Sequence, residues 1–393
     1  MKEAGSVISK LYALGAIGFS EGVGTSRVAY TEPFFEGRKY TESLMKEAGL
    51  VTRIDSVGNL FGMYPGKSNK KILIGSHLDT VPGGGMYDGA LGVLGGIECV
   101  GRLIREGCRF NHTIEIVGFI EEEGNAVGGT FGSRCFAGVP FGEKEVAAMV
   151  KYGVTPDDAS NAKCNPDDYL CYIELHIEQG GLLESRNTSV GIAEGIVGII
   201  RYAAAVKGES NHAGSTPMSL RSDAMMKSCD IIRQLAELVK QADESMVCTV
   251  GDFHIPGGAV NVIPGRTEFP IELRYKNVPD MEKVIDKLKR RYPESDMELN
   301  QFLNQKETVL DPKISNTVEK ICERQNISSV RMFSGAGHDA INTAFIMPSA
   351  LIFIPSVGGI SHSIREYSRP EDIETGISVL CELIKDLDKG EQL

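Results

Sequence analysis

Residues 71–107 read KILIGSHLDTVPGGGMYDGALGVLGGIECVGRLIREG, and this stretch indicates the fold class of the chain. KILIGS is a short apolar run rich in isoleucine, which is typical of a strand buried on both faces. A glycine-rich loop follows, and the segment after it has the apolar spacing of a helix that packs on a sheet. A buried strand, a loop and an amphipathic helix are the repeating unit of an α/β protein.

The same alternation recurs along much of the chain. The runs TIEIVGFI (113–120), YLCYIEL (169–175) and ALIFIP (350–355) have the composition of further buried strands. Residues 51–64 alternate between apolar and polar side chains, which suits an edge strand or hairpin. A last amphipathic helix is expected from Pro370. The predicted fold class is therefore α/β, with helices on both faces of the sheet.

The pattern changes near residue 198. From there the expected order is strand, helix, strands, helix and strand, which is the order of a small α+β sandwich of split βαβ, ferredoxin-like type. A chain of 393 residues is also too long for one compact core. We therefore predict a discontinuous domain of residues 1–198 and 309–393, interrupted by an inserted domain of residues 199–308.

Bulk composition narrows the class of protein. The net charge is -12, from 41 basic and 53 acidic residues, which argues against nucleic acid or an anionic membrane as the main partner. No apolar run reaches the ~20 residues that span a bilayer, and the N-terminal segment does not resemble an export signal. Nine cysteines without a CxxC pair indicate free thiols rather than a disulfide framework. A cytoplasmic protein is expected.

Side chains that bind metals or carry protons follow four of the predicted buried strands. Ligands in open α/β sheets bind outside the carboxyl ends of the strands, so these side chains are expected to converge. In chain order the groups are His77, Asp79 and Asp88; Glu121, Glu122 and Glu123; His176, Glu178 and Gln179; and His362.

Each of these residues also has an ordinary explanation when it is taken alone. A single histidine such as His77 is more often a structural residue than a ligand. A run of three glutamates is usually a solvated surface, and Asp88 stands in an Asp-Gly pair that is itself a turn signal. The joint occurrence of imidazole and carboxylate groups at four strand ends favours a metal site.

The chemistry of a metal pair accounts for these residue types. Zinc, manganese and cobalt accept imidazole and carboxylate ligands. Two cations about 3.5–4 Å apart need a bridging carboxylate and a bridging hydroxide, and Asp88 on its glycine-hinged loop fits the bridge. Glu122, next to a possible ligand in Glu123, fits a general base. Asp79 is two residues from His77 and is suited to fix the tautomer of that imidazole.

Seven motifs then carry a family resemblance: GSHLDTVPGGGMYDGALGVLGG, EEEGNAVGGTFGS, ELHIEQG, NHAGSTPM, NVIPG, SGAGHDA and GGISHSIRE. In this order and spacing the chain resembles the metal-dependent N-carbamoyl-L-amino acid hydrolase and allantoate amidohydrolase family, from about Gly22 to its end. That family belongs to a larger group of dinuclear-metal peptidases and deacylases. The resemblance implies a mixed-sheet catalytic domain of zinc-peptidase type, an inserted lid and dimerisation domain, and a homodimer.

The resemblance also implies a set of metal ligands. His77, Asp88 and His176 would hold one divalent ion, which is zinc, or manganese or cobalt. Asp88, Glu123 and His362 would hold a second ion, so that two ions are bound per subunit. The broader peptidase group usually has a carboxylate at the position of His176, and the histidine favours the carbamoylase and allantoate branch.

Further roles come from the same resemblance. Glu122 would be the general base and Asp79 would stand behind His77. His212 would stabilise the oxyanion, typically from the partner subunit of the dimer. The substrate-binding residues that the resemblance implies are Gln179, His212, Asn261, Arg274 and Gly359, with Arg274 as the clamp for a substrate carboxylate.

The function expected is hydrolysis of the C–N bond of a ureido group in a small carboxylate substrate. An N-carbamoyl-L-amino acid or allantoate is such a substrate, and a metal-bridging hydroxide would attack it with Glu122 as base. A dipeptidase or N-acyl-amino-acid deacylase with the same dinuclear site is the alternative. A non-catalytic binding protein that retains the fold would have lost a ligand or the base, and none is lost here. One departure is Ile364, where relatives often have proline, and it bears on local shape and substrate choice.

Overall fold

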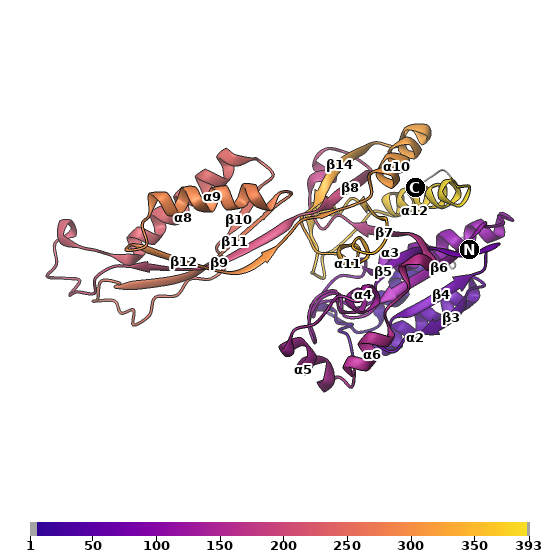
Figure 1. Ribbon diagram of the computed structural model, residues 1–393, viewed down its shortest axis with the longest axis horizontal. Helices are drawn as coiled ribbons and strands as arrows, with labels where there is room; N and C mark the ends of the chain where they lie inside the picture. The colour runs from indigo at the N-terminus through magenta and orange to yellow at the C-terminus, as the bar shows by residue number, and fades with distance from the viewer. Residues whose placement is uncertain (1–5, 391–393) are drawn as a thin grey trace. The chain divides into compact units, whose positions relative to one another are not determined.

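The computed structural model describes residues 6–390, and the chain divides into two compact units (Figure 1). Unit 1 comprises Met1–Glu194 and Val309–Leu393, and unit 2 comprises Gly195–Thr308. The sequence predicts the boundaries between the two domains at residues 198/199 and 308/309.

Unit 1 is built on a nine-stranded mixed sheet, so the predicted α/β class is confirmed. Its four central strands are neighbours in the order β15, β7, β5 and β6, and they run parallel. The strands β4 and β3 extend one edge in antiparallel fashion, and β8 pairs antiparallel with β15. The strands are β3 (Val51–Ile54), β4 (Leu60–Tyr64), β5 (Ser68–His77), β6 (His112–Phe119), β7 (Tyr169–Ile177), β8 (Val190–Ile196), β13 (Thr308–Val309), β14 (Ser329–Ser334) and β15 (Ser349–Ile354), with a separate small pair β1 (Phe19–Ser20) and β2 (Gly24–Thr25).

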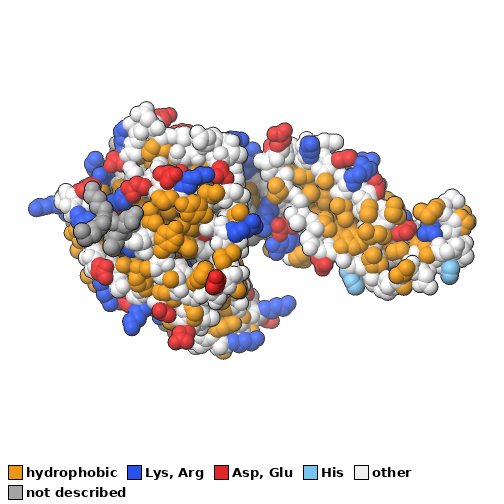
Figure 2. Space-filling view, turned by 180° about the vertical axis from the view of Figure 1, so that it is seen from behind, with side chains coloured by type: hydrophobic (Ala, Val, Ile, Leu, Met, Phe, Trp, Pro, Cys, Tyr) orange, Lys and Arg blue, Asp and Glu red, His pale blue; other side chains and the backbone are white. Residues whose placement is uncertain are grey.

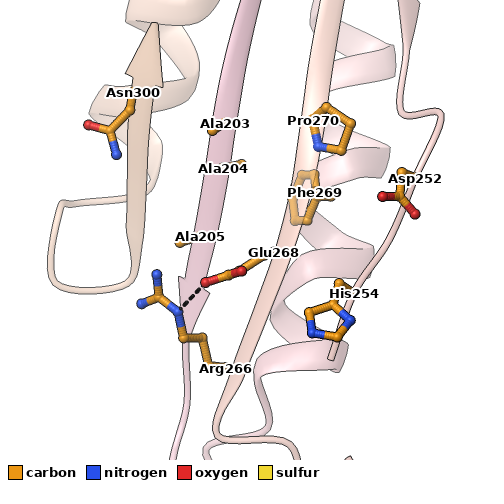
Figure 3. Close-up of a pocket in the computed structure, with 10 residues that line it drawn as sticks. All are labelled: Ala203, Ala204, Ala205, Asp252, His254, Arg266, Glu268, Phe269, Pro270 and Asn300. Carbon is orange, nitrogen blue, oxygen red and sulfur yellow. Dashed lines mark hydrogen bonds and ion pairs between the residues drawn. The ribbon is translucent and has the colours of Figure 1, made fainter. Parts of the chain in front are cut away.

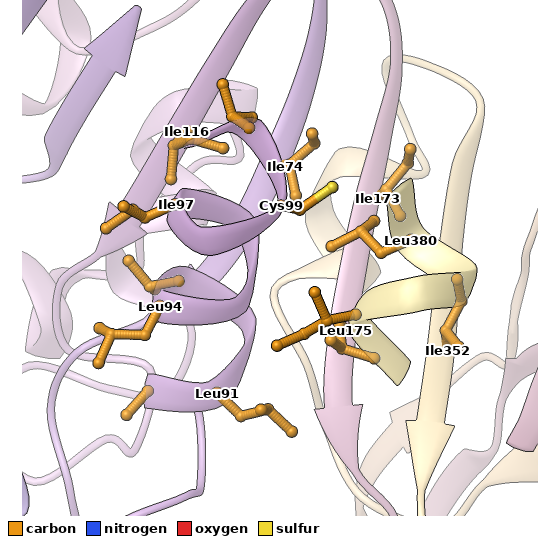
Figure 4. Packing of buried hydrophobic residues seen from close by; sticks show 14 of the residues in the cluster. Ile74, Leu91, Leu94, Ile97, Cys99, Ile116, Ile173, Leu175, Ile352 and Leu380 are labelled. Atoms are coloured by element: carbon orange, nitrogen blue, oxygen red, sulfur yellow. The ribbon is translucent and has the colours of Figure 1, made fainter. Parts of the chain in front are cut away.

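Helices cover the sheet of unit 1 because its strands are apolar on both faces. Helix α3 packs on β5 and β7 beside α12, and its apolar side chains belong to one buried cluster with Ile74, Ile173 and Leu175 of the strands (Figure 4). The other helices are α1 (Val7–Ala16), α2 (Glu32–Glu47), α4 (Phe131–Ala137), α5 (Glu143–Lys151), α6 (Pro156–Asn161), α7 (Leu182–Ser185), α10 (Pro312–Gln325) and α11 (Ala340–Thr343), beside α3 (Ala90–Arg105), α12 (Pro370–Asp388) and the 3₁₀ turns η1 (Pro166–Asp168) and η3 (Val357–Gly359).

Unit 2 is a four-stranded antiparallel sheet in the order β10, β11, β9 and β12. Helices α8 and α9 pack side by side on one face of it, over the buried side chains of Phe269, Ile271 and Leu273. The alternate residues of β11 lie on the opposite, helix-free face. The elements are β9 (Gly198–Lys207), η2 (Met218–Leu220), α8 (Ala224–Ala242), β10 (Val247–Thr249), β11 (Arg266–Tyr275), α9 (Val278–Arg291) and β12 (Met297–Gln305).

Helix α2 begins at Glu32, because Pro33 fits the first helical turn and Thr31 provides an extended residue before it. Strand β10 is short and comprises only Val247–Thr249. Among the described residues, no helix is both long and apolar enough to cross a bilayer. On the face seen in Figure 2, acidic and basic side chains are interspersed.

Candidate metal centre at the carboxyl edge of the sheet

The parallel strands of unit 1 bring the predicted side chains to one edge of the sheet. His77 is the last residue of β5 and His176 is the penultimate residue of β7. The glutamates 121–123 follow β6, and His362 lies in the loop after β15. Since the carboxyl ends of parallel strands face the same way, residues far apart in the sequence meet here.

The carboxylate of Asp88 stands at the centre of this group and is almost completely buried. Its Oδ1 atom lies 3.1 Å from His176 Nε2 and 3.6 Å from His77 Nε2. Its Oδ2 atom lies 3.1 Å from His362 Nε2. The two oxygens of one carboxylate therefore face two different groups of possible metal ligands, which is the geometry required of a carboxylate that bridges two ions.

The protonation of two histidines is defined by their neighbours. His176 Nδ1 lies 2.8 Å from the carbonyl oxygen of Ile177, and His77 Nδ1 lies 3.0 Å from that of Asp79. A carbonyl oxygen can only accept, so Nδ1 carries the proton in each ring. In a neutral ring Nε2 then presents a lone pair to Asp88, which also has only lone pairs to offer. A second proton or a cation must lie between them.

The second group of possible metal ligands surrounds Asp88 Oδ2. Glu123 Oε2 lies 3.4 Å from His362 Nε2, and Glu123 Oε1 is buried without a hydrogen bond to any described residue. Gln179 Nε2 donates to Asp88 Oδ2 at 2.7 Å. An unpaired buried carboxylate oxygen is costly, so this site demands a positive partner.

Glu122 lies beside these possible metal ligands but belongs to neither of the two groups. Its Oε2 atom is 3.8 Å from His77 Nε2, and burial raises its pKa well above the ordinary value. Its backbone N–H donates to Asp79 Oδ1 at 3.1 Å, and that of Glu123 donates to Asp79 Oδ2 at 3.1 Å. Asp79 thus holds His77 through its main-chain carbonyl, whereas its carboxylate positions the two glutamates.

The electrostatics of the cluster fit divalent cations. Asp79, Asp88, Glu122 and Glu123 place four carboxylates in a small buried volume. Burial and the neighbouring Asp88 raise the pKa of Glu123 to about 7. Burial would also raise the pKa of Asp88, but hydrogen bonds from the histidines hold it well below its usual range. Mixed imidazole and carboxylate donors are those that zinc, manganese and cobalt accept.

Tertiary contacts that the sequence did not indicate hold the loops in place. Glu366 Oε1 accepts hydrogen bonds from the backbone N–H groups of Tyr87 and Asp88, and its Oε2 accepts one from Ser361. Glu366 is the last residue of the GGISHSIRE motif. It ties the bridging residue to the loop that carries His362.

The sequence analysis did not identify a third group of possible metal ligands. Glu174, His176 and His338 present ligand atoms within 4.8 Å of one another, and all three are buried. The ring of His338 lies edge-on to His176, with ring centroids 4.5 Å apart. The alternation of Glu174 and His176 on one strand face and the SGAGHDA motif were the available signals. Glu178, by contrast, caps the turn of α7 by accepting from the N–H groups of Leu182 and Leu183.

The predicted substrate residues Gln179 and Gly359 belong to adjacent loops of unit 1. Both have positive φ, 57° and 64° respectively. A Cβ atom on Gly359 would meet the backbone nitrogen of Gly181 at 2.8 Å, so no side chain fits there. Left-handed backbone of this kind is common at ligand sites.

The other three predicted substrate residues lie in unit 2, at two separate places. Arg274 pairs with Ile199 near one end of the β9–β11 ladder, and Arg266 pairs with Lys207 at the other end. The pairing continues past that end to the His212–Val262 bridge, beside Asn261.

Eight residues of strand span about 27 Å, so Arg274 and His212 of one chain are at least that far apart. The structure therefore brings His212 and Asn261 together, but it does not bring either of them to Arg274.

Comparison with known proteins identifies the family of the chain. The model of Peptidase family M20/M25/M40 matches residues 73–386. The chain belongs to this family. The matched region of this M20-family chain contains every residue of the candidate metal centre.

Similar proteins share nearly the whole length of this M20-family chain. An N-carbamoyl-L-amino acid amidohydrolase of Geobacillus stearothermophilus is 35% identical over 97% of this chain and 98% of its own. An allantoate amidohydrolase of Escherichia coli (strain K12) is 32% identical over 95% of each. The crystal structure of a putative amidohydrolase/peptidase from Burkholderia cenocepacia superposes with a TM-score of 0.89, at 27% identity over 98% of each chain.

A glycine substitution tests whether the backbone at Asp88 shapes the centre. Gly89 has a φ of 63°, and a Cβ atom there would meet the ring of His77 at 2.4 Å. We expect Gly89→Ala to weaken binding of zinc about tenfold or more, because the ring must move. Competition with a chromophoric chelator measures this affinity.

Gly107 at the other end of α3 provides the matched control. Its φ is also positive, 80°, but nothing lies within 4 Å of an added Cβ. Gly107→Ala should cost about 1 kcal/mol of stability and leave zinc affinity unchanged. Equal zinc affinity in both variants would show that the Gly89 contact does not shape the site.

Proposed function

We propose that this chain is a metal-dependent amidohydrolase that cleaves the C–N bond of a ureido group in a small carboxylate substrate. The observation that carries the proposal is the Asp88 carboxylate, whose Oδ1 lies 3.1 Å from His176 Nε2 and whose Oδ2 lies 3.1 Å from His362 Nε2. Relatives named for N-carbamoyl-L-amino acids and for allantoate support the reaction class.

In this proposal Asp88 would be shared between two divalent ions. His77 and His176 would hold one ion with it, and Glu123 and His362 would hold the other. When bound, such an ion pair supplies Lewis acidity, which polarises a carbonyl and acidifies water. Zinc, manganese and cobalt are the candidates on donor chemistry.

Glu122 is the proposed general base. Its carboxylate is largely buried and stands outside both ligand sets, so it is available to accept a proton from the attacking water. The oxygen of that water adds to the ureido carbonyl carbon, and the carbonyl oxygen becomes an oxyanion. Glu122 then donates the proton to the leaving nitrogen as the C–N bond breaks. An N-carbamoyl substrate would yield an amino acid, ammonia and carbon dioxide.

His212 is suited to stabilise the oxyanion. Its Nδ1 accepts hydrogen bonds from the backbone N–H groups of Gly214 and Ser215, both at 3.1 Å. In the neutral ring the proton therefore lies on Nε2, which is a donor. We propose that Asn261 assists it, that Gln179 and Gly359 contact the substrate, and that Arg274 binds its carboxylate.

The separation within unit 2 supports a homodimer. His212 and Arg274 of one chain are at least about 27 Å apart along the β9–β11 ladder, farther than a small substrate reaches. If both contact one substrate molecule, they come from two copies of the chain. A cytoplasmic location is likewise proposed, supported by nine cysteines without a disulfide.

Co-expression of two inactive variants tests this sharing of sites. In a dimer of a His212→Ala chain and an Arg274→Ala chain, one site keeps both residues and the other loses both. Random pairing makes half of the dimers mixed, so we expect about a quarter of wild-type turnover. Each variant alone serves as the control. Absence of recovery in a mixture shown to contain mixed dimers would contradict a shared site.

A substitution that removes the general base but keeps the shape of the side chain tests the mechanism. We expect Glu122→Gln to retain both metal ions and to lose about 10³-fold or more in turnover, because the amide cannot accept the proton. Metal analysis and steady-state kinetics on the same preparation measure the two quantities. Turnover near that of the wild type in the metal-loaded variant would remove Glu122 from this role.

A substrate panel tests the reaction class. The panel contains N-carbamoyl-L-amino acids, allantoate, ureidopropionate, ureidoglycolate, N-acetyl amino acids and dipeptides. We expect turnover to be highest with a ureido acid, because similar proteins are named for N-carbamoyl-L-amino acids and for allantoate. Preferential hydrolysis of dipeptides or N-acetyl amino acids would favour the peptidase or deacylase alternative instead.

A further inference from the structure

A second arginine stands beside Arg274 on the helix-free face of the unit 2 sheet. Arg201 in β9 is paired with Glu272 in β11, two residues before Arg274. Glu272 Oε2 accepts a hydrogen bond from Arg201 Nε at 2.6 Å, and Glu272 Oε1 accepts one from Arg274 Nε at 2.7 Å. One carboxylate thus holds two guanidinium groups, one on each oxygen.

We propose that Arg201 and Arg274, held by Glu272, form a two-guanidinium site for the substrate carboxylate. The inference rests on the proposed function, which assigns this carboxylate to Arg274. It adds Arg201 as a second binding residue and Glu272 as the residue that positions both.

The charge of this cluster suits one carboxylate. The three side chains, two arginines and one glutamate, sum to a charge of +1, which is opposite in sign to a carboxylate. The other end of the same face holds Lys207, Arg266, Glu268 and Glu298, whose charges sum to zero. An anion is therefore attracted to the Arg274 end of the face and has no net attraction at the Arg266 end.

The geometry also leaves donors for a ligand. A guanidinium has five N–H donors, and Arg201 uses Nε alone in its hydrogen bonds to the described residues. Its side chain is 41% exposed, so solvent and ligand can reach its two remaining nitrogens. Because Nε is fixed, the plane of the guanidinium is oriented before a ligand binds, which reduces the entropy lost on binding.

Glu272 remains ionised in this arrangement. Burial would raise its pKa, but the hydrogen bonds from Arg274 and Arg201 lower it. Isolated ion pairs at a surface stabilise a fold very little, so stability alone does not explain a three-residue cluster of surplus charge. For the same reason, substitution of Arg201 is expected to leave the fold intact.

The chain offers a matched control on the same strand and face. Arg266 Nε donates to Glu268 Oε1 at 2.7 Å, the same spacing and contact as in the Arg274–Glu272 pair (Figure 3). It lines a cavity of about 500 Å³ on this face together with Ala203, Pro270 and Asn300. The Arg266–Glu268 pair differs from the Arg201–Glu272–Arg274 cluster because it has no second arginine and no net positive charge.

The test compares pairs of compounds that differ in the carboxylate alone. The probes are N-carbamoyl-L-alanine with N-carbamoyl-L-alaninamide, and allantoate with its monoamide. Steady-state kinetics are measured on the metal-loaded dimeric protein and its variants. Calorimetric titration of the same probes into the Glu122→Gln background reports binding without turnover.

We expect Arg201→Gln to raise KM for the carboxylate about tenfold or more and to change kcat less than about twofold. KM for the carboxamide should not change, and Arg266→Gln should behave as the wild type. Selectivity is the ratio of KM for the carboxamide to KM for the carboxylate. If Arg274→Gln loses this selectivity and Arg201→Gln keeps it, the role of Arg201 is overturned and that of Arg274 is not. Unchanged selectivity in Arg274→Gln would instead overturn the proposed carboxylate site.

Glu272→Gln separates positioning from net charge. This variant raises the charge of the cluster to +2, so a purely Coulombic role predicts a lower KM for the carboxylate. The proposal predicts a KM several-fold higher, because both guanidiniums lose their anchor. A lower KM would overturn the positioning role of Glu272.

Discussion

The candidate metal centre of unit 1 is built around one buried carboxylate, that of Asp88. Asp88 faces three imidazole nitrogens, two of which belong to rings whose other nitrogen is committed to a backbone carbonyl. A protein interior does not tolerate opposed lone pairs without a proton or a cation between them. The loops after β5, β6, β7 and β15 are therefore organised around a positive charge. Glu366 and Asp79 serve this requirement by fixing the backbone of Asp88 and of the two glutamates.

The sheet supplies the precision that this cluster needs. Four parallel strands are buried under α3 and α12 on one side, and their carboxyl ends open at one edge. Ligands carried on strand ends move less than ligands carried on free loops. Gln179 and His362 have left-handed backbone, and both side chains lie beside Asp88 Oδ2. In unit 2 the same logic of a rigid ladder separates Arg274 from His212 and aligns Arg201 with Glu272.

Family membership and geometry account for different parts of the proposed function. Membership of the M20/M25/M40 family defines the fold and the general chemistry, and similar proteins extend over nearly the full chain. The charge pattern on the helix-free face of unit 2 adds a physical reason for preferring a monocarboxylate. The donor set at Asp88 adds a physical reason for two cations.

The sequence by itself determined the α/β class, and it predicted an inserted domain and the residues of the candidate metal centre. It did so because apolar runs report buried strands, and because ligands follow the ends of such strands. It did not determine that Asp79 contacts His77 through a carbonyl, that Glu366 reaches Asp88, or that His338 packs on His176. Those contacts join residues by the path of the folded backbone, which local patterns do not encode. Nor did it place Arg201 beside Arg274, since the register between β9 and β11 is a property of the assembled sheet.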